Sequence, residues 1–104
     1  MITCYTDANI IDDERMEGSL CAHPTSGFWG DGEPEIYFGP YGRKFIKVVA
    51  SETTAGVQRE WQGIRFFVQC DPIESANGRP VPDRNCSVKA NDQHLMSATF
   101  IFKD

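Results

Sequence analysis

The sequence has no long apolar run and no excess of positive charge. No apolar run approaches the roughly 18 residues that a helix needs to cross a bilayer, so we expect no membrane span. Among 104 residues, 15 are acidic and 10 are basic, which gives a net charge of −5. Nucleic acids and anionic membranes attract proteins with basic surfaces. The charge balance therefore argues against nucleic acid as a partner.

The motifs of common catalytic and metal sites are missing too. The sequence has no Gly-x-Ser-x-Gly motif and no phosphate-binding glycine loop that ends in lysine. The two histidines, His23 and His94, lie far apart, and no two cysteines have the close spacing of zinc ligands. Asp31, Glu33 and Glu35 alternate with other residues, which is not the spacing of a calcium-binding loop. We expect no catalytic residue, no metal and no cofactor.

Four cysteines form an N-terminal pair, Cys4 and Cys21, and a C-terminal pair, Cys70 and Cys86. Four cysteines allow three connectivities, and we predict the two local ones, Cys4–Cys21 and Cys70–Cys86. Each closes a loop of about 15 residues, which contributes roughly 3 kcal/mol in the chain-entropy model. The start of the chain fits either a cytosolic protein or a mature secreted form whose leader was removed. Because disulfides persist in oxidising compartments, we expect the secreted, extracellular form. The glycosylation pattern Asn85-Cys86-Ser87 formally agrees with secretion.

Alternating apolar and polar residues indicate short strands. In 60–70, one face carries Ile64, Phe66, Val68 and Cys70; in 94–103, one face carries Met96, Ala98, Phe100 and Phe102, opposite Leu95. Further strand candidates are 44–51, 2–6, 35–38 and 87–90, with a hairpin turn at 53–56. The one helix candidate is 10–17, with acidic residues in its first turn. We predict a single all-β domain over 1–104, an antiparallel β-sandwich or barrel of about six strands.

Two regions are candidate binding surfaces. The segment 27–42 is rich in glycine and aromatics, and its Phe28, Trp29, Asp31 and Tyr41 could contact a partner. The alternative is structural, because aromatics also cover small cores. In the predicted strand 60–70, Trp61, Arg65 and Phe67 face away from the core. An exposed Trp and Phe on one strand suggest a covered surface, and hence a homodimer.

In size, acidity, strand pattern and the positions of its four cysteines, the chain resembles the small secreted effector or elicitor proteins of filamentous fungi. That resemblance implies a non-catalytic signalling protein that recognises the surface of a partner protein. A carbohydrate-binding, lectin-like module is an alternative, with Trp29 stacking on a sugar. A third reading is a protease inhibitor that uses the loop 72–84 and presents Arg79 or Arg84 to a trypsin-like pocket.

Overall fold

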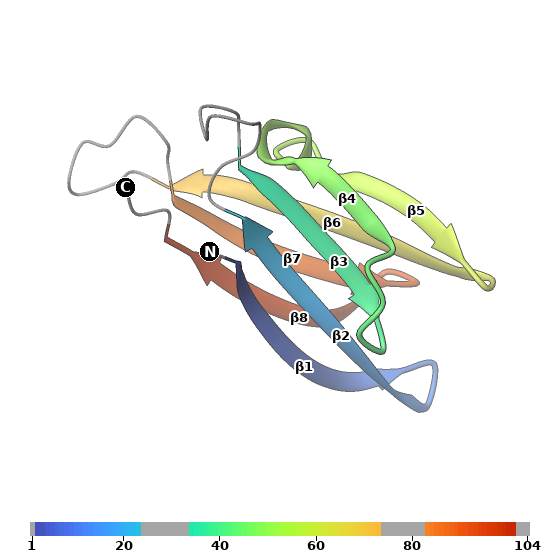
Figure 1. The fold of residues 1–104 in the computed structure, drawn as a ribbon. Coiled ribbons are helices and arrows are strands. Elements are labelled where there is room, and N and C mark those ends of the chain that lie inside the picture. The colour runs from blue at the N-terminus through green and yellow to red at the C-terminus, as the bar shows by residue number, and fades with distance from the viewer. Residues whose placement is uncertain (1, 24–33, 74–82, 102–104) are drawn as a thin grey trace.

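The protein is an all-β sandwich of two four-stranded antiparallel sheets (Figure 1). The computed structural model describes residues 2–23, 34–73 and 83–101. Sheet A contains β1 (Thr3–Ile11), β2 (Glu14–His23), β3 (Glu35–Pro40) and β4 (Ile46–Val49), in that order. Sheet B contains β5 (Val57–Trp61), β6 (Ile64–Ile73), β7 (Asp83–Ala90) and β8 (Gln93–Phe100). The expected all-β class is confirmed, with eight strands where the sequence suggested about six.

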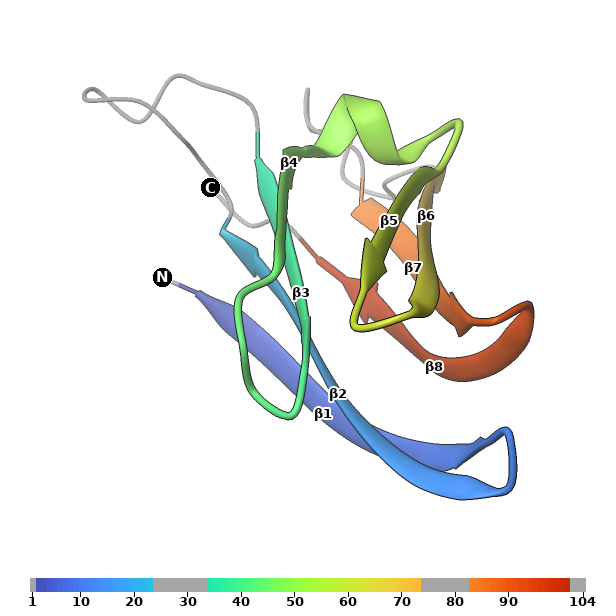
Figure 2. The same cartoon turned by 90° about the vertical axis from the view of Figure 1, so that its right-hand side faces the viewer.

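Each sheet is a simple meander, and a short 3-10 helix, η1 (Ala50–Thr53), connects one to the other (Figure 2). Within η1, the buried Thr53 hydroxyl donates a hydrogen bond to the carbonyl of Ala50. The predicted turn at 53–56 is therefore part of a crossing between sheets, not of a hairpin. Gly56 does adopt positive φ there, at 99°, as glycine readily does.

One hydrophobic cluster fills the space between the sheets. The rings of Phe38 in sheet A and Phe66 in sheet B are fully buried, with centroids 5.3 Å apart. Most inward residues of the strands alternate along the chain, and β8 departs from that alternation. A register shift opposite Val88 and Lys89 bulges the strand, so that neighbouring Leu95 and Met96 are both buried. A bulge of this kind puts an extra residue on one face.

The predicted helix over 10–17 is wrong: this stretch contains the hairpin that joins β1 to β2. Asp12 and Asp13 form the turn, with φ of 50° and 67°, values that short hairpin turns require. Asp12 is held by hydrogen bonds from Asn91 (2.7 Å), in the turn between β7 and β8, and from Gln93, the first residue of β8. A contact with the opposite sheet thus fixes a turn whose local sequence favours a first helical turn.

The predicted strand over 60–70 contains a second hairpin. Gln62 and Gly63 adopt positive φ between β5 and β6, so Trp61 lies directly opposite Ile64. Directly opposed residues share one face of a sheet, and Trp61 packs against the core beside Phe45. The expectation that Trp61 faces outward with Phe67 is therefore wrong. The homodimer hypothesis therefore loses Trp61, one of the two residues that motivated it.

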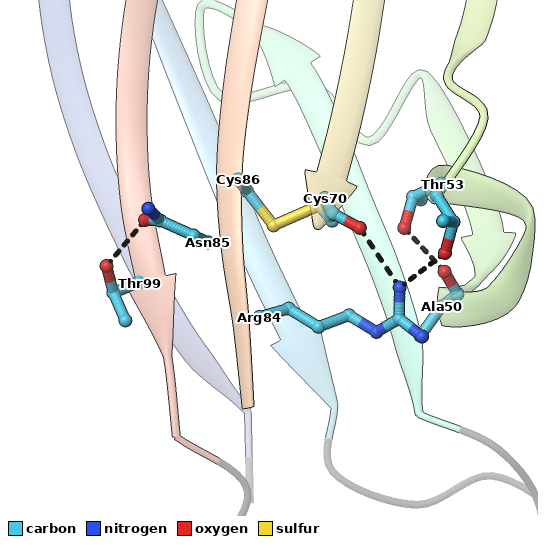
Figure 3. The surroundings of a disulfide bond; sticks show 8 residues. Ala50, Thr53, Cys70, Arg84, Asn85, Cys86 and Thr99 are labelled. Atoms are coloured by element: carbon cyan, nitrogen blue, oxygen red, sulfur yellow. Dashed lines mark hydrogen bonds between the residues drawn. A yellow bond between two sulfur atoms is a disulfide. The ribbon is translucent and has the colours of Figure 1, made fainter. Parts of the chain in front are cut away.

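Both predicted disulfides are present, and each joins directly opposed residues of neighbouring strands. Cys4 in β1 pairs with Cys21 in β2, and Cys70 in β6 pairs with Cys86 in β7. Their positions in the sandwich differ. Cys70 and Cys86 lie in the core, with exposures of 0% and 2% (Figure 3). The Cys4–Cys21 bridge lies on the outer face of sheet A, where Cys4 is exposed.

Candidate functional site

Three of the six binding residues predicted from the sequence, Tyr41, Trp61 and Arg65, lie within the described residues. Phe28, Trp29 and Asp31 lie outside the described residues. Tyr41 is exposed in the turn after β3 and lines a hollow of about 300 Å³ at the end of the sandwich. Arg65 is exposed on β6 and forms an ion pair with Asp92 at 3.1 Å. Of these candidates, Tyr41 and Arg65 keep exposed side chains that could contact a partner.

A different surface, on the outer face of sheet A, brings together more polar, charged and aromatic side chains. A hollow of about 230 Å³ lies beside the Cys4–Cys21 disulfide. Its lining comes from β1, β2, β3 and the loop that leads into β4: Cys4, Ser19, Cys21, Tyr37, Phe38, Gly39, Gly42, Arg43 and Lys44. We call this hollow, with the adjoining side chains of Glu35 and Lys47, the Tyr37 surface.

The loop of the Tyr37 surface folds back over β3 because Gly39 has no side chain. The carbonyl oxygen of Arg43 lies 0.9 Å from where a Cβ on Gly39 would be. The return is fixed by hydrogen bonds from the Phe45 amide to the Phe38 carbonyl at 2.9 Å and from the Arg43 amide to the Pro40 carbonyl at 3.1 Å. Any larger residue at position 39 would push away the segment that carries Arg43 and its neighbour Lys44.

Strand register aligns the floor of this surface. Cys4, Cys21, Tyr37 and Lys47 lie opposite one another on β1, β2, β3 and β4. The four side chains therefore share the outer face and form one row across the sheet. The disulfide links the β1–β2 end of that row covalently, beside Tyr37 on the next strand.

The ring of Tyr37 is surrounded by charge. The Nζ atoms of Lys44 and Lys47 lie 5.5 and 5.8 Å from its ring centroid, within the range of cation–π attraction. Its hydroxyl donates to Glu35 Oε1 at 3.3 Å, and Lys47 approaches the other oxygen of that carboxylate at 3.9 Å. Partial burial, followed by the negative charge of Glu35, raises the pKa of the Tyr37 phenol.

Hydroxyl groups border the hollow on the side of the first hairpin. The side chains of Thr6 and Ser19 lie 3.0 Å apart and are hydrogen-bonded to each other, on directly opposed positions of β1 and β2. The surface thus combines a disulfide and a tyrosine ring with hydroxyls, one carboxylate and three cations. Three cations close together stand out in a chain whose net charge is −5.

Sequence reasoning missed Tyr37, Arg43, Lys44 and Lys47 as a group. The alternation of Lys44 and Lys47 with apolar residues marks a strand, but it does not show that a neighbouring strand places Tyr37 beside them. The one local signal is the sequence Gly39-Pro40-Tyr41-Gly42, which indicates a tight turn. The consequence of that turn for Arg43 is visible only when the chain is folded.

The prediction that Arg84 is presented to a protease is wrong, because its side chain is buried beside the core disulfide (Figure 3). Its Nη1 donates to the Thr54 hydroxyl at 2.9 Å and to the Cys70 carbonyl at 3.0 Å. A residue that is 8% exposed cannot enter a protease pocket. Arg79, the other candidate, lies outside the described residues and stays a prediction.

No protein-family model, curated protein or solved structure matches the chain. Within the described residues, no helix is long and apolar enough to cross a membrane. In the same part of the chain, no three His, Cys, Asp or Glu side chains gather as metal ligands.

Proposed function

We propose that this is a secreted, non-catalytic binding protein, and that the Tyr37 surface is where it recognises its partner. The observation that carries the proposal is that Lys44 and Lys47 both approach the ring of Tyr37, which lines a hollow beside a disulfide. Tyrosine and arginine are enriched among residues that dominate binding energies. The two disulfides are compatible with an extracellular location.

Charge gives this surface a preference for anionic partners. Arg43, Lys44 and Lys47 contribute three positive charges, and Glu35 contributes one negative charge. The rest of the chain is acidic, so an anionic partner is attracted here and repelled elsewhere. That contrast orients a partner on the molecule, and it predicts binding that weakens as salt screens the charges.

Rigidity supports recognition by this face rather than by a loop that orders on binding. Tyr37 lies on the third strand of a four-stranded sheet, and the neighbouring hairpin carries a disulfide. A preformed surface loses little conformational freedom when a partner binds. The effector-like signalling role implied by the sequence fits such a surface and remains part of this proposal.

The proposal is tested by following backbone amide signals by NMR while anionic probes are added. The probes are a short glutamate peptide and a short oligogalacturonate, with a neutral cello-oligosaccharide as the reference. We expect at least one anionic probe to shift amides of β2, β3 and residues 41–47 together. If neither does so at low salt, the Tyr37 surface is not a recognition site.

A matched pair of variants separates this surface from general electrostatic attraction. Lys44→Ala removes an exposed cation beside Tyr37, whereas Lys89→Ala removes an exposed cation from β7, on the outer face of sheet B. Both substitutions are at the surface, so each should change stability by less than about 0.5 kcal/mol. Binding that falls equally in both variants would show that the attraction is not located at Tyr37.

A further inference from the structure

The Tyr37 surface has features that distinguish among anionic partners. We propose that its ligand is a carboxylate-bearing carbohydrate, a chain of uronate sugars. The inference rests on the proposed function above and adds the chemical class of the ligand.

The position of the hollow argues against an extended acidic peptide. Peptides that bind to sheets add to an edge strand and use its backbone hydrogen bonds. The hollow instead lies over β2 and β3, the two inner strands of sheet A, each paired on both sides. The backbone groups of β2 and β3 are already used in strand pairing, so recognition over these two strands falls to side chains.

The side chains that remain suit a sugar ring. Thr6, Ser19 and the Tyr37 phenol offer hydroxyls, and Glu35 offers a carboxylate that accepts hydrogen bonds from sugar hydroxyls. The disulfide of Cys4 offers an apolar patch to the less polar face of the ring. Ligand sites typically combine such apolar contact with a few well-placed polar groups.

The cations select the charge of that sugar. Lys47 already contacts Glu35, at 3.9 Å, which leaves Arg43 and Lys44 as the cations best placed to pair with ligand carboxylates. Arginine accepts a carboxylate through two parallel hydrogen bonds. Among the described residues, the Tyr37 surface carries three cations and one carboxylate, so it fits a chain with a single charge per sugar better than a heavily sulfated one.

The test compares affinities in the NMR titration for oligogalacturonate, the glutamate peptide and the neutral cello-oligosaccharide. We expect oligogalacturonate to bind most tightly and to shift the amides around Tyr37. Arg43→Ala and Lys44→Ala should each weaken it about tenfold, as loss of a charge-assisted hydrogen bond does. Lys89→Ala, on the other sheet, should leave the affinity unchanged.

Other outcomes overturn the inference in distinguishable ways. If the glutamate peptide binds this surface and oligogalacturonate does not, the ligand class is wrong while the proposed function stands. Equal binding of the neutral oligosaccharide would show that the cations do not select the ligand. If the same amides shift with protein concentration alone, a second copy of the chain occupies the surface. If no probe shifts them, the proposed function fails as well.

Discussion

Removing the two disulfides one at a time should cost different amounts of stability, although the two are alike as cross-links. The sequence separations are 17 and 16 residues, and both bridges join directly opposed residues with Cα atoms 4.0 Å apart. In the chain-entropy model each contributes about 3 kcal/mol, and the difference in loop length changes this by less than about 0.1 kcal/mol. Any larger difference must come from the folded state.

Burial supplies that difference. Cys70 and Cys86 are enclosed between the sheets, whereas Cys4 is exposed and Cys21 lies beside an open hollow. Replacing the core pair by alanine removes two buried sulfurs and leaves a closed cavity. Relative to the outer pair, the core pair loses the burial of about one additional methylene-sized group and leaves the cavity. Together these cost about 1 to 2 kcal/mol more. We therefore expect a loss of about 4 to 5 kcal/mol for the core pair and about 3 kcal/mol for the outer pair.

Urea unfolding at neutral pH measures both values. The two double variants, Cys4→Ala with Cys21→Ala and Cys70→Ala with Cys86→Ala, are compared with the unaltered protein. In the unaltered protein, a low concentration of dithiothreitol should also reduce Cys4–Cys21 first, because Cys4 is exposed whereas Cys70 and Cys86 are both enclosed in the core. Equal losses of stability, or a larger loss for the outer pair, would refute the argument from burial.

Three other regions give independent predictions. Arg84→Met should lower the free energy of unfolding by about 2 to 3 kcal/mol, since it removes charged hydrogen bonds in a buried setting. Urea unfolding measures this against the exposed control Arg59→Met, and a loss no larger than that of the control would contradict the prediction. Hydrogen bonds from Asn91 and Gln93 lower the pKa of Asp12 in the folded protein. The stability that they contribute is therefore present above the unfolded pKa of Asp12, and it is lost as pH falls through the lower folded pKa. As pH is lowered, the melting temperature of Asp12→Asn should fall less than that of the unaltered protein. An identical pH dependence in the two proteins would show that protonation of Asp12 does not affect stability. Gly39→Ala should displace the loop over β3 and abolish amide shifts by oligogalacturonate, and unchanged shifts would mean that the loop does not form the site.

Much of the architecture could be read from the sequence, because sheet pairing and alternation are local properties. Two cysteines that flank one hairpin are brought opposite each other by that hairpin, so their pairing followed from spacing. The inward face of β6 followed from the alternation of Phe66, Val68 and Cys70. These inferences needed only the two-residue period of a strand.

The errors arose where a turn lacked a strong local signal. Asp12-Asp13 is acidic and suits the start of a helix, and Gln62-Gly63 lies inside a stretch that alternates like one strand. Missing the second turn placed Trp61 on the wrong face, because a hairpin turn resets which residues point inward. Leu95 was assigned outward for a related reason, since a bulge interrupts the alternation.

The sequence by itself determined that this chain is β-rich, acidic and joined by two local disulfides, since composition, alternation and cysteine spacing depend on near neighbours along the chain. Only the tertiary structure decided that one disulfide lies in the core and the other faces outward, because that depends on which face of each sheet the other sheet covers. The same holds for the Tyr37 surface. Its cations meet the tyrosine and the disulfide through strand register and through the close approach allowed at Gly39, contacts between residues separated in sequence.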